Sequence, residues 1–173
     1  MARATHDLVG WRASAMGQKR LGEVLLSSGE ISDRELRLAL HEQQAAGRKL
    51  GQVLIDLGLC EEREVSKALA VQAGRDFIDV EAFPIQAEAV KRVPIKVMKA
   101  HSVVPLLIVN GELLVATIPS NERRATEQVS FISGLRVRVA IGAPAAIAHL
   151  ISVIDSAIAK HASKKEPELT IDY

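Results

Sequence analysis

The sequence predicts an α+β protein, with an all-helical N-terminal lobe of two repeated helical hairpins followed by a small α/β lobe with a β-hairpin. Near the N-terminus, apolar residues at helical spacing recur at an offset of 29 residues, from Arg20 to Lys49. Further along, Asn110-Gly111 separates two apolar runs, as in a hairpin with a type I′ turn. An apolar-periodic segment over residues 144–159 predicts a long helix near the C-terminal end.

The repeat relates residues 20–43 to residues 49–72. Identities at the constant offset fall at Leu21/Leu50, Gly22/Gly51, Val24/Val53, Leu25/Leu54, Gly29/Gly58, Ala39/Ala68, Leu40/Leu69 and Gln43/Gln72. Repeated apolar positions alone would fit two similar hairpins packed together. Repeated glycines and glutamines are harder to explain by packing. They favour one binding surface with two similar halves, which would suit a ligand with two similar halves.

Each copy of the repeat predicts a short helix followed by a longer one. Gly29 and Gly58 are placed to end the short helices. Ser32 followed by Glu35 has the pattern of a capping box at the start of the first long helix. Gly47 marks the turn between the copies, and the second long helix is expected to stop at Gly74.

Beyond residue 74 the pattern becomes mixed. We expect an extended segment over residues 77–80, short helices over 87–93 and 95–101, and hairpin strands on either side of Asn110-Gly111. A helix is expected from Asn121, as its N-cap, to Ser133, with Gly134 as its stop. Alternating apolar and basic residues over 135–139 predict a strand with one buried face.

These patterns divide the chain into four parts. We predict an N-terminal extension over residues 1–19, in which residues 8–16 form a short helix. The duplicated helical motif occupies residues 20–74 and forms the ligand-binding lobe. The small α+β lobe covers residues 75–160, and a flexible tail covers residues 161–173.

Composition argues against several classes of partner. A net charge of +1 and an aromatic fraction of 3% give no reason to expect a nucleic-acid polymer. The longest apolar run, residues 103–109, is too short to span a bilayer, so no direct membrane insertion is expected. Cys60 is the single cysteine, which rules out an intramolecular disulfide and fits a cytoplasmic protein.

The sequence also lacks the residue patterns of catalysis. There is no Gly-x-x-x-x-Gly-Lys-Ser/Thr phosphate loop, and no dinucleotide-binding glycine pattern after a strand. The histidines have no cysteine or carboxylate partners at metal-ligand spacing. Cys60 fits a small, partly buried residue better than a catalytic thiol. We therefore predict a protein that is not an enzyme and that holds no metal and no cofactor.

The repeat resembles the MshEN domain, the N-terminal domain of type II secretion and type IV pilus assembly ATPases. That family's motif reads Arg-Leu-Gly-x-x-Leu-x-x-x-Gly, an apolar residue, then Leu-x-x-x-Leu-x-x-Gln, twice, with a five-residue spacer. The first copy here is Arg20, Leu21, Gly22, Leu25, Gly29, Ile31, Leu36, Leu40 and Gln43. The second copy keeps Leu50, Gly51, Leu54, Gly58, Leu69 and Gln72, with Lys49 and Val65 in place of arginine and leucine. The resemblance spans residues 20–155, and we expect the domain here without its ATPase.

In that family the domain binds cyclic di-GMP, so the resemblance implies this bacterial signalling ligand. Arg20 and Lys49 would supply charge and donors to phosphates or guanine edges. Gly22 and Gly51 would let backbone N–H groups approach the ligand. Apolar contacts to the guanines would come from Leu21, Leu36, Leu40, Leu50, Val65 and Leu69. Gln43 and Gln72 would hydrogen-bond polar edges at the ends of those apolar stripes.

Two functional hypotheses follow. The first is a non-catalytic cyclic di-GMP receptor, whose repeats clamp the ligand and signal to a protein partner in secretion, pilus or motility machinery. The second is a ligand-free adaptor or scaffold that docks on type II secretion or type IV pilus machinery.

Overall fold

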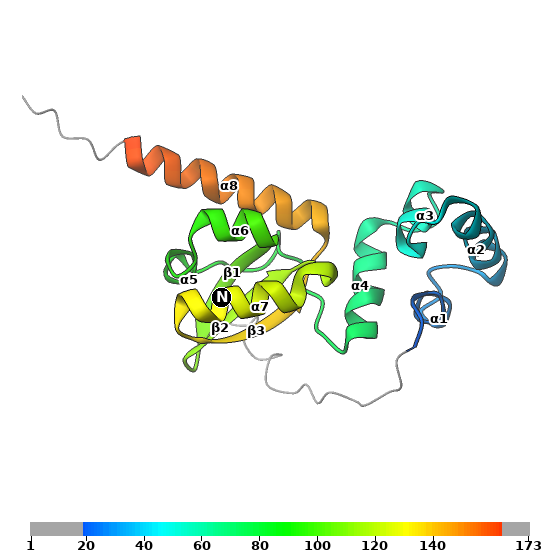
Figure 1. The fold of residues 1–173 in the computed structure, drawn as a ribbon, viewed down its shortest axis with the longest axis horizontal. Helices are drawn as coiled ribbons and strands as arrows, with labels where there is room; N and C mark the ends of the chain where they lie inside the picture. Colours follow the sequence, from blue (N-terminus) through cyan, green and yellow to red (C-terminus); the bar gives the residue numbers. More distant parts are fainter. Residues whose placement is uncertain (1–18, 164–173) are drawn as a thin grey trace, which may run out of the picture.

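The computed structural model describes residues 19–163, and side chains as far as Lys160. The predicted helix over residues 8–16 and the tail beyond Ser163 lie outside the described residues. The elements, in chain order, are helices α1 (Leu21–Ser27), α2 (Asp33–Ala46), α3 (Leu50–Asp56), α4 (Glu62–Ala73), α5 (Ala87–Lys91) and α6 (Ile95–His101); strands β1 (Val103–Val109) and β2 (Glu112–Thr117); a 3₁₀ turn η2 (Pro119–Asn121); helix α7 (Glu122–Ser133); strand β3 (Arg136–Ile141); and helix α8 (Pro144–Ser163). The α+β class and the helical lobe ahead of a hairpin-containing lobe are thus confirmed (Figure 1).

The helical lobe, α1 to α4, holds a hydrophobic core of its own. Its buried members are Val24, Leu25, Ile31, Ala39, Val53, Leu54, Cys60, Val65 and Ala68. Helix α1 packs chiefly against α4, and α3 chiefly against α2. The two copies of the repeat are therefore interlocked, each short helix lying on the long helix of the other copy. This arrangement brings both copies onto one core.

Local capping fixes the ends of the long helices. Ser32 precedes α2, and its hydroxyl accepts a hydrogen bond from the Glu35 N–H at 3.3 Å. The Glu35 carboxylate in turn accepts the Ser32 N–H at 2.7 Å. Gly47 and Gly74 take left-handed conformations directly after α2 and α4, as helix C-caps commonly do. The predicted capping box, the predicted turn at Gly47 and the predicted helix stop at Gly74 are confirmed.

Replacing Ser32 by alanine is expected to lower the free energy of unfolding by about 1 kcal/mol, because an N-cap hydroxyl satisfies a helix N–H that alanine leaves unpaired. Urea unfolding followed by circular dichroism measures this change. Ser28, whose hydroxyl donates to Leu25 O at the end of α1, offers a control outside a helix N-terminus. A loss for Ser32→Ala no larger than that for Ser28→Ala would contradict the capping role.

The sheet has three strands in the order β1-β2-β3. Strands β1 and β2 form an antiparallel hairpin, and Asn110 and Gly111 at its tip both have positive φ, 51° and 77°. This is the backbone that a type I′ turn requires. Strand β3 runs parallel to β2, with α7 as the connecting helix. Residues 76–78 lie beside β3, where Ile78 N–H donates to Ile141 O at 2.8 Å.

Helices cover this sheet so that strands β1 and β2 are largely buried. Helix α8 packs on β1 and β2, α7 on β3, and α5 and α6 on β1 (Figure 1). Consecutive buried residues in β1 and β2 show that both faces of these strands are covered. Leu106, Leu113, Val115 and Ile147 are among the fully buried side chains of this second core.

Three local expectations differ from the structure. Asn121 occupies the N-cap position of α7 but makes no side-chain cap, because its amide instead donates to His101 O at 3.2 Å. Strand β3 begins at Arg136 and continues to Ile141, because its last three residues enter the core and pair with β2. Helix α8 runs four residues beyond the predicted end, to Ser163.

Helix α4 joins the two lobes. Glu62, at its start, accepts a hydrogen bond from the Ala145 N–H of α8 at 2.9 Å. The next residue, Arg63, forms an ion pair with Asp79 at 2.9 Å. Just after the helix, Arg75 pairs with Glu122 of α7. Because α4 also carries Val65 in the helical core, any movement of α4 acts on both lobes.

Candidate functional site

The two candidate cations occupy equivalent backbone positions. Arg20 and Lys49 are the N-cap residues of α1 and α3, with nearly the same φ and ψ, −70° and 151° for Arg20 and −70° and 139° for Lys49. Both side chains are exposed, and neither forms an ion pair with another residue of the part that the structure describes. Two unpaired cations at matching places could thus each contact one half of an anionic ligand.

The immediate surroundings of these cations are not identical. The Arg20 N–H donates to the carboxylate of Glu23 at 2.9 Å. In the second copy the matching residue is Gln52, and its amide donates to Asp56 at 2.8 Å instead. The second copy therefore has no carboxylate at the position of Glu23.

The repeated glycines have a packing role that the sequence analysis missed. An ideal Cβ on Gly22 would lie 2.8 Å from Leu36 Cδ1, and one on Gly51 would lie 2.8 Å from Val65 Cγ1. Both glycines are buried, and Leu36 and Val65 are themselves equivalent in the repeat. The glycines thus let each short helix approach the following long helix. The sequence held a signal for this packing role, because Gly22 precedes Leu36 by the same number of residues as Gly51 precedes Val65.

Replacing Gly51 by alanine is expected to lower the free energy of unfolding by about 1–3 kcal/mol, the usual range for overpacking a core. Its Cβ would also lie 3.4 Å from Leu21, and Val65, which is 4% exposed and stiff about χ1, has no room to move away. Gly22→Ala is the matched control, since the half-buried Leu36 can shift toward solvent. Thermal unfolding of both variants gives the comparison. Equal losses in stability would contradict this account.

The apolar and amide residues of the proposed site differ in exposure. Leu40 is 39% exposed, whereas Val65 is 4% exposed and belongs to the core. Intermediate exposure is found for Leu21, Leu36, Gln43, Leu50, Leu69 and Gln72. Leu21 of the first copy and Val65 of the second both lie against Gly51, within 3.4 and 2.8 Å of where a Cβ on that glycine would be. Leu40 is the candidate apolar residue that is most available to a ligand.

Two cavities are lined by residues other than those of the predicted site. One, of about 400 Å³, lies where the start of α4, residues 77–81 and the start of α8 meet; its lining includes Glu61, Phe77 and His149. The other, of about 270 Å³, is lined by Arg75, Asp76, Glu112, Thr126, Val137, Arg138 and Val139. Neither cavity is lined by a residue of the predicted site.

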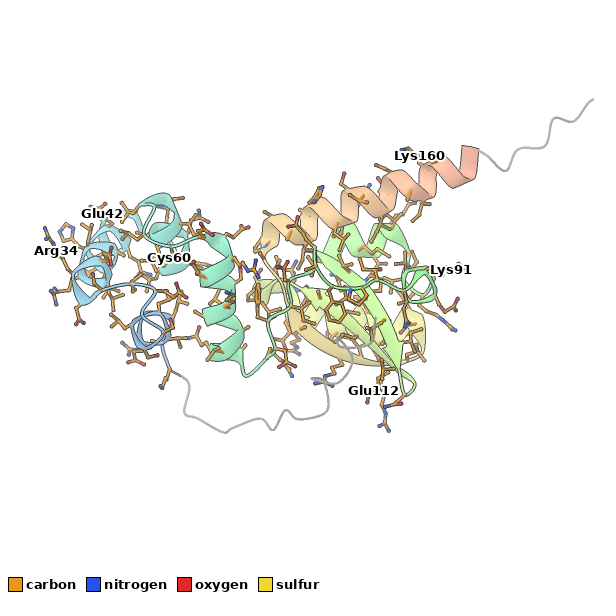
Figure 2. The ribbon with its side chains drawn as sticks, turned by 180° about the vertical axis from the view of Figure 1, so that it is seen from behind. Arg34, Glu42, Cys60, Lys91, Glu112 and Lys160 are labelled. Carbon is orange, nitrogen blue, oxygen red and sulfur yellow. The ribbon has the colours of Figure 1, made fainter. Side chains whose placement is uncertain are left out.

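Cys60 lies between α3 and α4, inside the helical lobe (Figure 2). Burial raises the pKa of its thiol, and the negative charge of Glu64 raises that pKa further. A raised pKa leaves little reactive thiolate at neutral pH. Within the described residues, no group of three or more histidine, cysteine or acidic side chains could hold a metal ion.

The fold and the repeat define a two-part α+β domain built on a duplicated helical motif. The chain belongs to the MshEN domain family, whose model matches residues 73–160. That match covers the sheet lobe and leaves the repeat residues outside it.

A curated relative and two solved structures extend the comparison. The type IV pilus assembly ATPase PilB of Myxococcus xanthus is 29% identical over 150 residues, which cover 87% of this chain and 25% of PilB. The chain thus spans about a quarter of that relative's length. A structure of MshE with cdg superposes with a TM-score of 0.63 at 24% identity, over 78% of this chain and 97% of the other. The N-terminal domain of XpsE gives a TM-score of 0.54 at 24% identity, over 79% and 97%.

The structural similarity to MshE and XpsE is one of fold. No helix among the described residues is long and apolar enough to cross a membrane.

Proposed function

We propose that this chain is a non-catalytic receptor module for cyclic di-GMP. The observation that carries the proposal is the pair of equivalent cations, Arg20 and Lys49, each at the start of a short helix in an interlocked repeat and neither ion-paired among the described residues. Cyclic di-GMP has two guanines and two phosphates, so a duplicated surface can serve each half with similar groups. The structural neighbour MshE, solved with cdg, supports the same ligand.

The described contacts suggest how the ligand is held. The fork of Arg20 can donate two parallel hydrogen bonds to a phosphate or a guanine edge. Leu40 and its equivalent Leu69 offer apolar surface to the guanine faces, and Gln43 and Gln72 offer amide donors and acceptors one helical turn further along. Leu21, Leu36, Leu50 and Val65 support this surface from beneath, together with Gly22 and Gly51.

Binding is read out by a protein partner. Helix α4 carries Leu69 and Gln72 of the site and also contacts β3, η2 and α8 of the sheet lobe. A ligand that fixes the position of α4 therefore changes the surface that the sheet lobe offers to a protein partner. The relatives PilB and XpsE favour a partner in cytoplasmic secretion, pilus or motility machinery.

Ligand-linked stability tests the proposal. A ligand that binds only the folded state at a concentration of one hundred times Kd stabilises that state by about 2.7 kcal/mol. Urea unfolding with cyclic di-GMP is expected to show an increase of this size, and GMP, GTP and ATP are expected to show none. An unchanged unfolding midpoint at millimolar cyclic di-GMP would overturn the receptor proposal.

The adaptor alternative is favoured by one observation, the packing of Gly22 on Leu36 and of Gly51 on Val65, which gives the repeated glycines a structural role that needs no ligand. It predicts a protein partner in the same machinery and no stabilisation by the dinucleotide, so the same unfolding experiment separates the two functions.

A further inference from the structure

The basic residues ahead of the two short helices occur in opposite order. The first copy has Lys19 then Arg20, and the second has Arg48 then Lys49. Each copy thus contains one guanidinium and one ammonium, exchanged between neighbouring positions. Lys49 offers only a point charge, and its ammonium group cannot donate the two parallel hydrogen bonds that an arginine guanidinium can.

In the structure, the guanidinium of the second copy is held along α3. Arg48 forms an ion pair with Asp56, the last residue of that helix. Gln52 lies one turn before Asp56 on the same face of α3, and its amide donates to the other oxygen of Asp56 at 2.8 Å. Arg48 is therefore drawn from the start of α3 toward its end.

Among the described residues, the first copy has no equivalent ion pair along its short helix. Ser27 occupies the position of Asp56, and its hydroxyl donates to Val24 O within its own helix. Within the described part of the chain, Lys19 forms no ion pair. The Arg48–Asp56 pair is half exposed, with 50% and 36% of the two side chains accessible. Pairs this exposed are weak, so a phosphate or guanine edge can compete for the arginine.

We propose that Arg48 is the specificity-determining guanidinium of the second half-site, and that Asp56 holds it away from the ligand until binding. This inference rests on the proposed cyclic di-GMP function. When Arg48 is released from Asp56, its guanidinium can donate to the ligand the two parallel hydrogen bonds that Lys49 cannot make. Asp56 thereby lowers the affinity of the second half-site without contacting the ligand.

The repeat supplies matched controls for calorimetric titration with cyclic di-GMP. Arg48→Ala is expected to weaken binding about tenfold, the loss of one charge-assisted contact, whereas Lys19→Ala changes affinity less than about twofold. Asp56→Asn is expected to tighten binding about two- to fivefold, because the competing charge is removed. Ser27→Asp, the matching position of the first copy, leaves affinity nearly unchanged.

A rescue variant separates this role from a structural one. The double variant Arg48→Lys with Lys49→Arg returns the fork to the position it has in the first copy, and it is expected to restore wild-type affinity or better. Urea midpoints of all variants should match the wild type, since the exchanged groups are exposed. Wild-type binding together with equal affinities for Arg48→Ala and Lys19→Ala would overturn the role of Arg48. Absence of any wild-type binding would instead overturn the receptor proposal itself.

Discussion

Removing contacts of the first half-site should weaken the binding of cyclic di-GMP strongly. The variant Arg20→Ala is expected to weaken binding by about 10- to 100-fold, because a hydrogen bond to a charged group contributes about 1.5–3 kcal/mol. Gln43→Ala is expected to weaken it about 2- to 10-fold, as for a neutral hydrogen bond. Isothermal titration calorimetry with the single and double variants measures both losses.

Two residues of the same lobe that lie outside the predicted site serve as controls. Arg34 and Glu42 lie on α2 and point away from the lobe (Figure 2). Their alanine variants are expected to bind as the wild type does. Full affinity in both Arg20→Ala and Gln43→Ala would show that the repeat surface is not where the ligand binds.

Truncating the helical core should have the largest effect on stability. Leu54 is completely buried in α3, and Leu54→Ala is expected to lower the free energy of unfolding by about 2–5 kcal/mol through lost burial and a residual cavity. The equivalent residue of the first copy, Leu25, is equally buried, so Leu25→Ala should cost a similar amount. Domains of this size are stable by only about 5–15 kcal/mol, so either change removes a substantial fraction.

Cys60 provides a local measurement of this loss. Its thiol lies in the same core, and its raised pKa slows its reaction in the folded state. Labelling should therefore accelerate in Leu54→Ala in proportion to the opening of the lobe. Leu57→Ala, at a site 41% exposed, is the control and should leave both labelling and the urea midpoint nearly unchanged. Equal effects at Leu54 and Leu57 would contradict a core centred on Leu54.

Features set by neighbouring residues could be predicted from the sequence. The Ser32–Glu35 capping box and the Asn110-Gly111 turn depend on contacts between residues a few positions apart, and the structure has both. The glycine stops at Gly47, Gly74 and Gly134 likewise depend on one backbone conformation each. Such features leave a readable pattern because the interacting groups lie in one short segment.

Features set by distant contacts could not be predicted in the same way. The pattern of α1 shows that it has an apolar face, but not that this face lies chiefly on α4 of the other copy. Asn121 looked like an N-cap, yet its amide bonds His101 O because η2 brings the two segments together. The Arg48–Asp56 pair spans two turns of α3 and follows from side-chain length and direction.

For the candidate site, the sequence indicated its residues but not their surroundings. Equivalent positions for Arg20 and Lys49 follow from the repeat and are present in the structure. The packing of Gly22 on Leu36 and of Gly51 on Val65 adds a structural reason for the glycines that needs no ligand. The identity of the ligand-contacting residues stays a prediction.

Direct calorimetric titration of cyclic di-GMP into the purified chain, with GMP, GTP and ATP as controls, tests the central claim. The account predicts saturable binding, micromolar or tighter, to the cyclic dinucleotide alone. Heats equal to those of dilution into buffer would contradict it, and the repeat would then serve as architecture for an adaptor.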